Sequence, residues 1–218
     1  MRNSIIYLLG VVLIFSTTNV STQITELKSY VKISDTSGNF TGVLDNSDNF
    51  GGAEGIGDLD GDGIEDIAVA AHLDDDGATD AGAIWILFLN LDGSVKSHQK
   101  ISNLEGSLGN IFHAQEYVGY DISNLGDLDG DGVVDIAVGA PFSNNSGTNK
   151  GTVYILFLNT DGTVKSTQEI RAGVSGFTAT IDYNDYFGES ITNLGDLDGD
   201  GVIDIAVGAR GDDDGGTD

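Results

Sequence analysis

The chain has 218 residues, and its 35 acidic side chains against 9 basic ones give a formal net charge of −26. Such a charge repels phosphate, which excludes nucleic acid as a partner, and it disfavours anionic membrane surfaces. The sequence contains no cysteine, which excludes a disulfide framework, thiol catalysis and a cysteine–zinc site.

The N-terminal segment has the pattern of an export signal. A basic residue precedes the apolar run 5–15, and a stretch rich in Ser and Thr follows it. Eleven residues are too few to span a bilayer, which needs about 20. We therefore expect a signal peptide at residues 1–22, cleavage within 16–23, and a secreted or cell-surface protein without a membrane span. The alternative is that the apolar run forms a buried first strand.

The segment that follows is similar to the end of a later repeat. Residues 27–34 match 95–102 and, more loosely, 164–171. The first copy is therefore expected to be the last strand of a repeat whose other strands are not seen before it. In a closed ring of sheets, such a strand completes the final sheet and removes an exposed edge. We interpret residues 23–49 as this closing strand and the polar loop that leads into the first repeat.

An acidic loop then occurs three times. Its copies begin at Asp58, Asp127 and Asp196, and successive copies are spaced by 69 residues. A segment that returns at a fixed period indicates a repeat architecture. Each copy has Asp at loop positions one, three, five and nine and Gly at positions four and six.

This loop has the chemistry of a calcium site. Crowded carboxylates repel one another, and Ca²⁺ takes six to eight oxygen ligands, whereas Mg²⁺ prefers few carboxylates and several waters. The glycines allow positive φ angles, so the chain can wrap around an ion. An EF-hand would need Glu at position twelve, which here is Val69, Val138 or Val207. We expect a calcium loop inside a β-hairpin; the alternative is an Asp/Gly-rich turn that binds nothing.

The residues after each loop predict strands. In the first repeat, the β-branched run 66–71 is followed by the long apolar run 82–90, a hairpin turn at Asp92-Gly93 and the strand 95–102. The second repeat copies this order through 151–159, and no stretch has sustained helical periodicity. The expected fold is all-β, with four strands in each repeat.

Other candidate residues receive simpler interpretations. The runs Asp74–Asp76 and Asp212–Asp214 are expected to be solvated acidic loops, with a second metal site as the alternative. Trp85 aligns with Tyr154, and each is expected to be a packed strand residue. The three histidines occupy unrelated repeat positions and are expected to be isolated turn or surface residues: His72, His98 and His113.

Together, Phe187-Gly188, the three Asp-x-Asp-Gly-Asp-Gly loops and Gly139-Ala140-Pro141 resemble FG-GAP repeats. These repeats form the head of integrin α subunits and occur in many secreted bacterial proteins. The resemblance covers about residues 27–218 and implies a β-propeller, usually of seven blades, with calcium in the hairpin between the first two strands of a blade. The Gly-Ala-Pro motif is intact only in the second repeat.

The resemblance implies one Ca²⁺ for each loop, three in all. The implied ligands are four carboxylates and one backbone carbonyl from each loop: Asp58, Asp60, Asp62, Ile64 and Asp66; Asp127, Asp129, Asp131, Val133 and Asp135; Asp196, Asp198, Asp200, Val202 and Asp204.

The repeats divide the rest of the chain into three expected blades at residues 50–116, 117–186 and 187–218, the last of them truncated. Seven blades at this period would need roughly 480 residues, so we expect a partial propeller from a longer protein. The expected function is a secreted adhesion or recognition scaffold with structural calcium and an extracellular protein or glycan ligand. The alternative is the propeller part of a larger secreted glycan-processing enzyme. No catalytic group stands out in this chain, so in that case the catalytic part would be missing from it.

Overall fold

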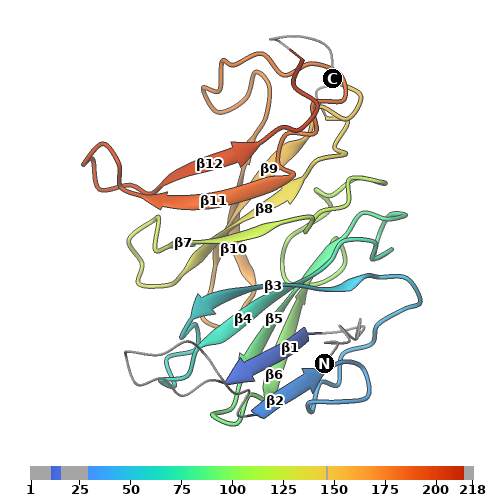
Figure 1. Cartoon of the computed structure of the whole chain (residues 1–218), viewed down its shortest axis with the longest axis vertical. Coiled ribbons are helices and arrows are strands. Elements are labelled where there is room, and N and C mark those ends of the chain that lie inside the picture. Colours follow the sequence, from blue (N-terminus) through green and yellow to red (C-terminus); the bar gives the residue numbers. More distant parts are fainter. Residues whose placement is uncertain (1–10, 16–28, 146, 214–218) are drawn as a thin grey trace, which may run out of the picture.

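The computed structural model describes residues 11–15, 29–145 and 147–213. Within these ranges every regular element longer than a turn is a β-strand, and all strand pairs are antiparallel (Figure 1). The described part of the chain accordingly holds no helix that is long and apolar enough to cross a membrane. The all-β prediction is confirmed.

Two complete sheets form the centre of the molecule. The first has the order β3-β4-β5-β6, and its strands are Phe50–Gly57, Asp66–Ala71, Ala83–Leu89 and Val95–Ile101. The second has the order β7-β8-β9-β10, and its strands are Ile122–Gly126, Asp135–Ala140, Thr152–Leu158 and Val164–Ile170. Each is a meander of four sequential strands, which is the form of a propeller blade.

Two hairpins flank these blades. The first pairs β1 (Val11–Phe15) with β2 (Ser29–Ile33), and the second pairs β11 (Ser190–Gly195) with β12 (Asp204–Gly208). Residues 11–15 of the expected signal peptide thus form a strand paired with β2. Most of residues 1–22 lie outside the described part of the chain, and the signal peptide stays a prediction.

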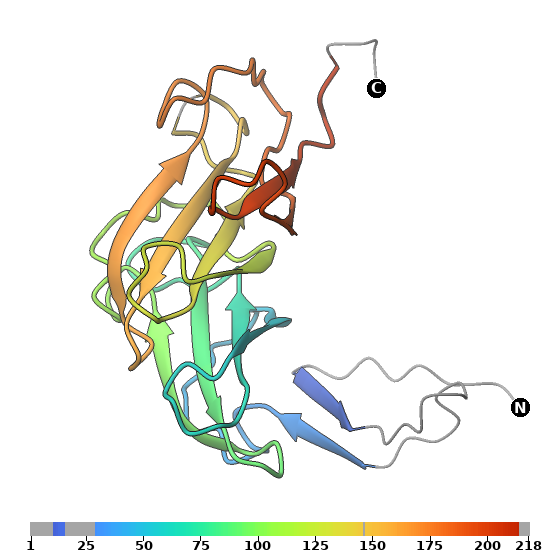
Figure 2. The same cartoon turned by 90° about the vertical axis from the view of Figure 1, so that its left-hand side faces the viewer.

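The sheets stack side by side along the long axis of the molecule, with the β1–β2 hairpin at one end and the β11–β12 hairpin at the other (Figures 1 and 2). Hydrogen bonds between side chain and backbone join the first strands of neighbouring blades. The Asn124 amide donates to the Gly55 carbonyl at 3.0 Å, and the Asn193 amide donates to the Asn124 carbonyl at 2.8 Å. The same kind of hydrogen bond recurs one repeat later. The side-by-side packing of the first strands therefore follows from the period of the sequence.

Burial explains the composition of the strands. All residues of β4, β5 and β8 are buried, so these strands are continuously apolar apart from the position-nine aspartates, as expected for a strand covered on both faces. The fourth strands lie at the outside and are polar in their middle. Between the two complete blades lies an apolar core to which Ile84, Ile86, Ile136, Val138 and Leu156 contribute.

Two glycines allow close contact between successive blades. Gly82 has φ +92°, and a Cβ built on it would lie 2.2 Å from the Val118 carbonyl oxygen. Gly151 has φ +85°, and its Cβ would lie 2.0 Å from the Phe187 carbonyl oxygen. Only glycine combines this conformation with this approach of two backbones. These contacts position the first strand of each following sheet.

Candidate metal centres

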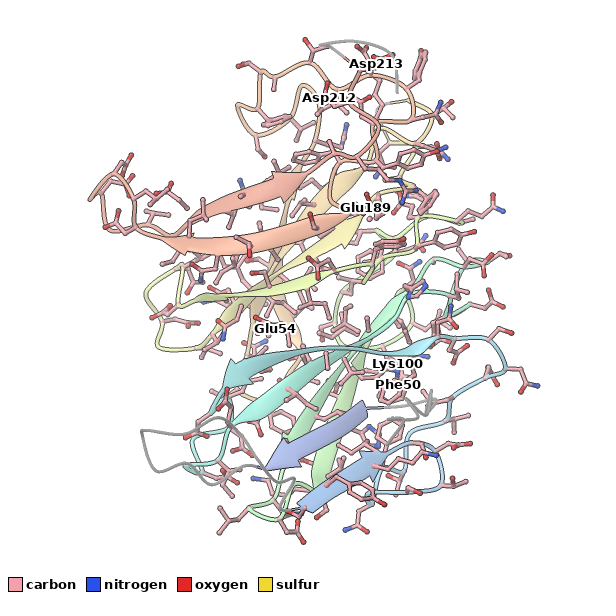
Figure 3. All side chains as sticks on the ribbon, viewed as in Figure 1. Phe50, Glu54, Lys100, Glu189, Asp212 and Asp213 are labelled. Carbon is pink, nitrogen blue, oxygen red and sulfur yellow. The ribbon has the colours of Figure 1, made fainter. Side chains whose placement is uncertain are left out.

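The three acidic loops connect the first two strands of each sheet, β3–β4, β7–β8 and β11–β12, as the hairpin prediction requires. All three loops lie along the same edge of the stack (Figure 1), and Figure 3 shows carboxyl oxygens gathered on the loop that projects between β11 and β12. The repeated sequence therefore produces a row of acidic loops on one side of the molecule.

The first aspartate of each loop organises the turn. Both carboxyl oxygens of Asp58 accept backbone hydrogen bonds, from the N–H of Asp62 at 2.9 Å and of Gly63 at 2.8 Å. Asp127 and Asp196 accept the equivalent bonds in the other two loops. The glycines at positions four and six have φ between +78° and +89° in all three loops, which turns the backbone amides inward.

The ninth position ties the loop to the body of the sheet. Asp66 is fully buried, and its two carboxyl oxygens accept from the N–H of Leu59 in the loop and of Leu89 at the end of β5, both at 3.0 Å. Asp135 makes the same pair of bonds with Leu128 at 2.9 Å and Leu158 at 3.1 Å. Burial raises the pKa of both aspartates. These carboxyls therefore couple the loop geometry to the third strand.

Each loop brings three carboxylate oxygens within 4.8 Å of one another. Two oxygens bound to one Ca²⁺ at about 2.4 Å lie at most about 4.8 Å apart, so these groups fit a single calcium ion, and a donor set made only of oxygens suits such a hard cation. The groups are Asp58, Asp60 and Asp62; Asp127, Asp129 and Asp135; Asp196, Asp198 and Asp204.

One expected carboxylate ligand of each loop lies outside these groups. These are Asp66 in the first loop, Asp131 in the second and Asp200 in the third. At position seven, the N–H of Ile64, Val133 and Val202 donates to the carboxylate at position five at 2.8–2.9 Å. This bond fixes the backbone turn whose carbonyl is the expected fifth ligand.

Two lysines belong to the site although the sequence analysis did not single them out. Lys96 Nζ lies 2.5 Å from Asp60 Oδ2 and also pairs with Asp62, whereas Lys165 Nζ lies 2.6 Å from Asp129 and 2.5 Å from Asp131. These ion pairs lower the pKa of Asp62 and of Asp131. The recurrence of Val-Lys at the same place in both repeats is the signal that could have revealed them.

One prediction about an acidic loop is wrong. Asp74 is not solvated but only 2% exposed, and Lys100 Nζ lies 2.7 Å from its carboxylate and 2.6 Å from that of Asp76. Lys100, labelled in Figure 3, also lies over the ring of Trp85 at 5.3 Å. A buried carboxylate needs such a partner. Asp74 and Asp76 thus form an ion-pair cluster with Lys100, whereas Asp75 between them is exposed.

The corresponding place in the second blade uses mostly uncharged partners. Glu116 is buried and accepts from the hydroxyls of Ser143 at 2.8 Å and Tyr154 at 2.9 Å. Ser143 aligns with Asp74 and Tyr154 with Trp85, so the two blades satisfy the same position by different chemistry. Both aromatic residues are packed in strands, as predicted.

An all-β chain of stacked four-stranded antiparallel sheets, each with an acidic hairpin between its first two strands, has the features of a partial β-propeller. The FG-GAP repeat family matches residues 50–87 and 118–156. These segments begin at the first strand of each complete sheet or just before it. The chain is an FG-GAP repeat protein of the integrin α type.

Curated relatives support this assignment. The chain is 36% identical over 155 residues to integrin alpha-PS5 of Drosophila melanogaster and 32% identical over 161 residues to integrin alpha-4 of Xenopus laevis. It is 30% identical over 167 residues to integrin alpha-3 of Cricetulus griseus. The matches cover 71%, 73% and 75% of this chain but only 14% of each relative, so the chain spans about one-seventh of their length.

Proposed function

We propose that this chain is a calcium-stabilised propeller segment that serves as an extracellular adhesion or recognition scaffold. The observation that carries the proposal is the acidic hairpin, which places three carboxylate oxygens within 4.8 Å of one another in each of three repeats. The named integrin relatives support the adhesion class, and an extracellular protein or glycan is the proposed kind of ligand.

Calcium has a structural role in this proposal. An ion bound to the loop offsets the repulsion among the carboxylates, and the ninth-position aspartate connects the loop to the end of the third strand. Because the unfolded chain does not hold these groups together, binding to the folded state stabilises it by mass action. The three proposed blades at 50–116, 117–186 and 187–218 each contain one such loop.

Calorimetric titration of the metal-free chain with Ca²⁺ tests the proposal. We expect three bound ions for each chain and a clear preference over Mg²⁺. A variant with Asp58→Asn and Asp60→Asn in the first loop should bind two, with the fold retained by circular dichroism. A chain that binds no Ca²⁺ even at millimolar concentration would contradict the proposed role of the loops.

Export remains a prediction of the N-terminal sequence. When the chain is produced with a secretion-competent host, N-terminal sequencing of the exported product should show a start within residues 16–23. A product that stays inside the cell with its first residues intact would contradict the signal peptide and favour the retained strand β1.

A further inference from the structure

The lysine–aspartate pairs of this chain differ in their access to water. The side chains of Lys96 and Lys165, which pair with the acidic loops, are 36% and 39% exposed. In contrast, the side chains of Lys100 and Asp74 are only 8% and 3% exposed, and Lys100 Nζ lies 2.7 Å from Asp74 Oδ2. An amine and a carboxyl group that are held together without water are the two reactants of an amide bond.

The surroundings of this pair supply the other groups that such a reaction needs. A carboxylate oxygen of Asp76 lies 2.6 Å from Lys100 Nζ, and the Ser102 hydroxyl donates to the same oxygen at 3.2 Å. The backbone N–H of Asp76 donates to Asp74 Oδ1 at 2.9 Å. The amine therefore contacts a proton acceptor, and the reacting carboxyl group has a hydrogen-bond donor at the oxygen that faces away from the amine contact.

We propose that Lys100 and Asp74 form an intramolecular amide bond, which cross-links β6 to the loop after β4. First, a proton moves from Lys100 Nζ to Asp74 Oδ2, which gives a neutral amine and a carboxylic acid. Nζ then bonds to Cγ of Asp74 and gives a second proton to the Asp76 carboxylate. When the Cγ–Oδ2 bond breaks, Asp76 returns this proton to the departing hydroxyl, which leaves as water.

The reaction needs no oxidant, metal or external reagent. The negative charge that develops on Asp74 Oδ1 during the attack is stabilised by the N–H of Asp76. Burial lowers the pKa of Lys100, but its hydrogen bonds to the two carboxylates outweigh burial and raise it, so the resting form is the ion pair. Proton transfer inside the pair still gives the neutral form, and a fixed contact of this kind corresponds to an effective molarity of roughly 10⁵–10⁸ M.

The product suits the buried site better than the ion pair does. The amide removes two opposite charges whose burial is costly. The neighbouring carboxylates do not depend on the lysine charge alone. Asp76 is 29% exposed and keeps its bond from Ser102. Asp48 is buried and interacts with both Lys100 and Asp74, and burial raises its pKa, so it can take up a proton.

The second blade shows that the pair is not a general feature of the repeat. Ser143 stands at the position of Asp74 and Glu169 at that of Lys100, so the second blade has neither reactant. In the first blade, the bond would close a covalent ring over residues 74–100 around β5. Such a ring restricts the unfolded chain as a disulfide does, in a sequence that contains no cysteine. The proposal does not depend on calcium or on the first residues of the chain.

Mass spectrometry of the purified chain tests the bond directly. We expect a mass that is lower than that of the sequence by one water molecule. Digestion with a protease that cuts after lysine should give one branched peptide that joins residues 74 and 100. The exposed Lys96 and Lys165 serve as internal controls and should be cleaved normally. A chain of full sequence mass, with Lys100 cleaved like the other two lysines, would overturn the proposal.

Two variants test the assigned roles. Lys100→Arg keeps a positive charge beside Asp74 but has no amine, so it should have the full sequence mass while circular dichroism shows the same strand content. Asp76→Asn keeps the reacting pair but removes the proton acceptor, so the fraction of branched peptide in freshly made protein should fall several-fold. Loss of one water in Lys100→Arg would contradict the assignment of Lys100, and an undiminished branched peptide in Asp76→Asn would contradict the role of Asp76.

Discussion

At the scale of single residues, the acidic loops are already partly balanced by protein cations. Lys96 bridges Asp60 and Asp62, and Lys165 bridges Asp129 and Asp131. No described lysine or arginine pairs with the aspartates of the third loop. The same carboxylates that would bind Ca²⁺ therefore carry an internal competitor in the first two loops.

Replacement of Lys96 should expose this competition. We expect Lys96→Gln to raise the Ca²⁺ affinity of the first loop several-fold, because the variant removes a positive charge that shares its carboxylates, and to lower the stability of the calcium-free chain. Calorimetric titration and unfolding in chelator measure the two effects. Lys32→Gln on β2 is the charge-matched control. A lower affinity in the Lys96 variant would show that the lysine supports the ion instead of competing with it.

The buried ninth-position aspartate should contribute to stability even without calcium. In Asp66→Asn, the side-chain amide cannot accept from both Leu59 and Leu89, which leaves one buried N–H without an acceptor. We expect a loss of about 2–3 kcal/mol in urea unfolding with chelator present.

Asp204→Asn is the control for this prediction. Asp204 accepts a single described backbone bond and is less buried than Asp66, so the same substitution should cost about 1 kcal/mol or less. Equal losses in the two variants would mean that the bond to the third strand does not stabilise the fold.

At the scale of the elements, the contact between successive sheets depends on glycine. We expect Gly151→Ala to cost about 3 kcal/mol, because its Cβ would overlap the Phe187 carbonyl oxygen. The loss should appear in urea unfolding, and faster amide exchange in β11 and β12 should accompany it. Gly109→Ala is the control, since Gly109 has a similar φ of +76° but no atom within 4 Å of the added Cβ, and it should cost about 1 kcal/mol. Similar losses of unfolding free energy in the two variants would show that backbone strain, and not overlap with the Phe187 carbonyl, causes the destabilisation.

Most of the elements were predictable from local sequence. The apolar run 82–90 and its copy 151–159 predicted the third strands, Asp92-Gly93 predicted a hairpin, and the fixed spacing of the loops predicted repeated sheets. The N-terminal run was ambiguous, because an apolar stretch of this length suits both a signal peptide and a buried strand. The pairing of β1 with β2 became visible only in three dimensions.

The contacts between distant residues were not predictable in this way. The buried Asp74, in the loop after β4, is paired by Lys100, which is 26 positions away in β6. Composition and period describe each segment by itself. They do not reveal whether the carboxylates of an acidic run are hydrated or paired with a distant lysine. The same reason hid Lys96 and Lys165, which approach the loops only after the outer strands have packed.

At the scale of the whole molecule, the charge of −26 and the repeated acidic loops oppose folding unless cations offset them. The three loops hold twelve aspartates at the repeated positions, and three divalent ions would reduce the net charge to about −20. The ions that the loops are proposed to bind should therefore stabilise the entire stack. This stabilisation by bound Ca²⁺ should exceed the stabilisation that salt gives by screening the charges.

Thermal unfolding of the whole chain in Ca²⁺, in chelator, and in chelator with NaCl of matched ionic strength is the most direct test of structural calcium. We expect the midpoint in Ca²⁺ to exceed both other midpoints by more than 10 °C, since saturation of several sites adds about 3 kcal/mol for each site held at 100-fold its dissociation constant. A midpoint that is the same in Ca²⁺ and in chelator would contradict the account.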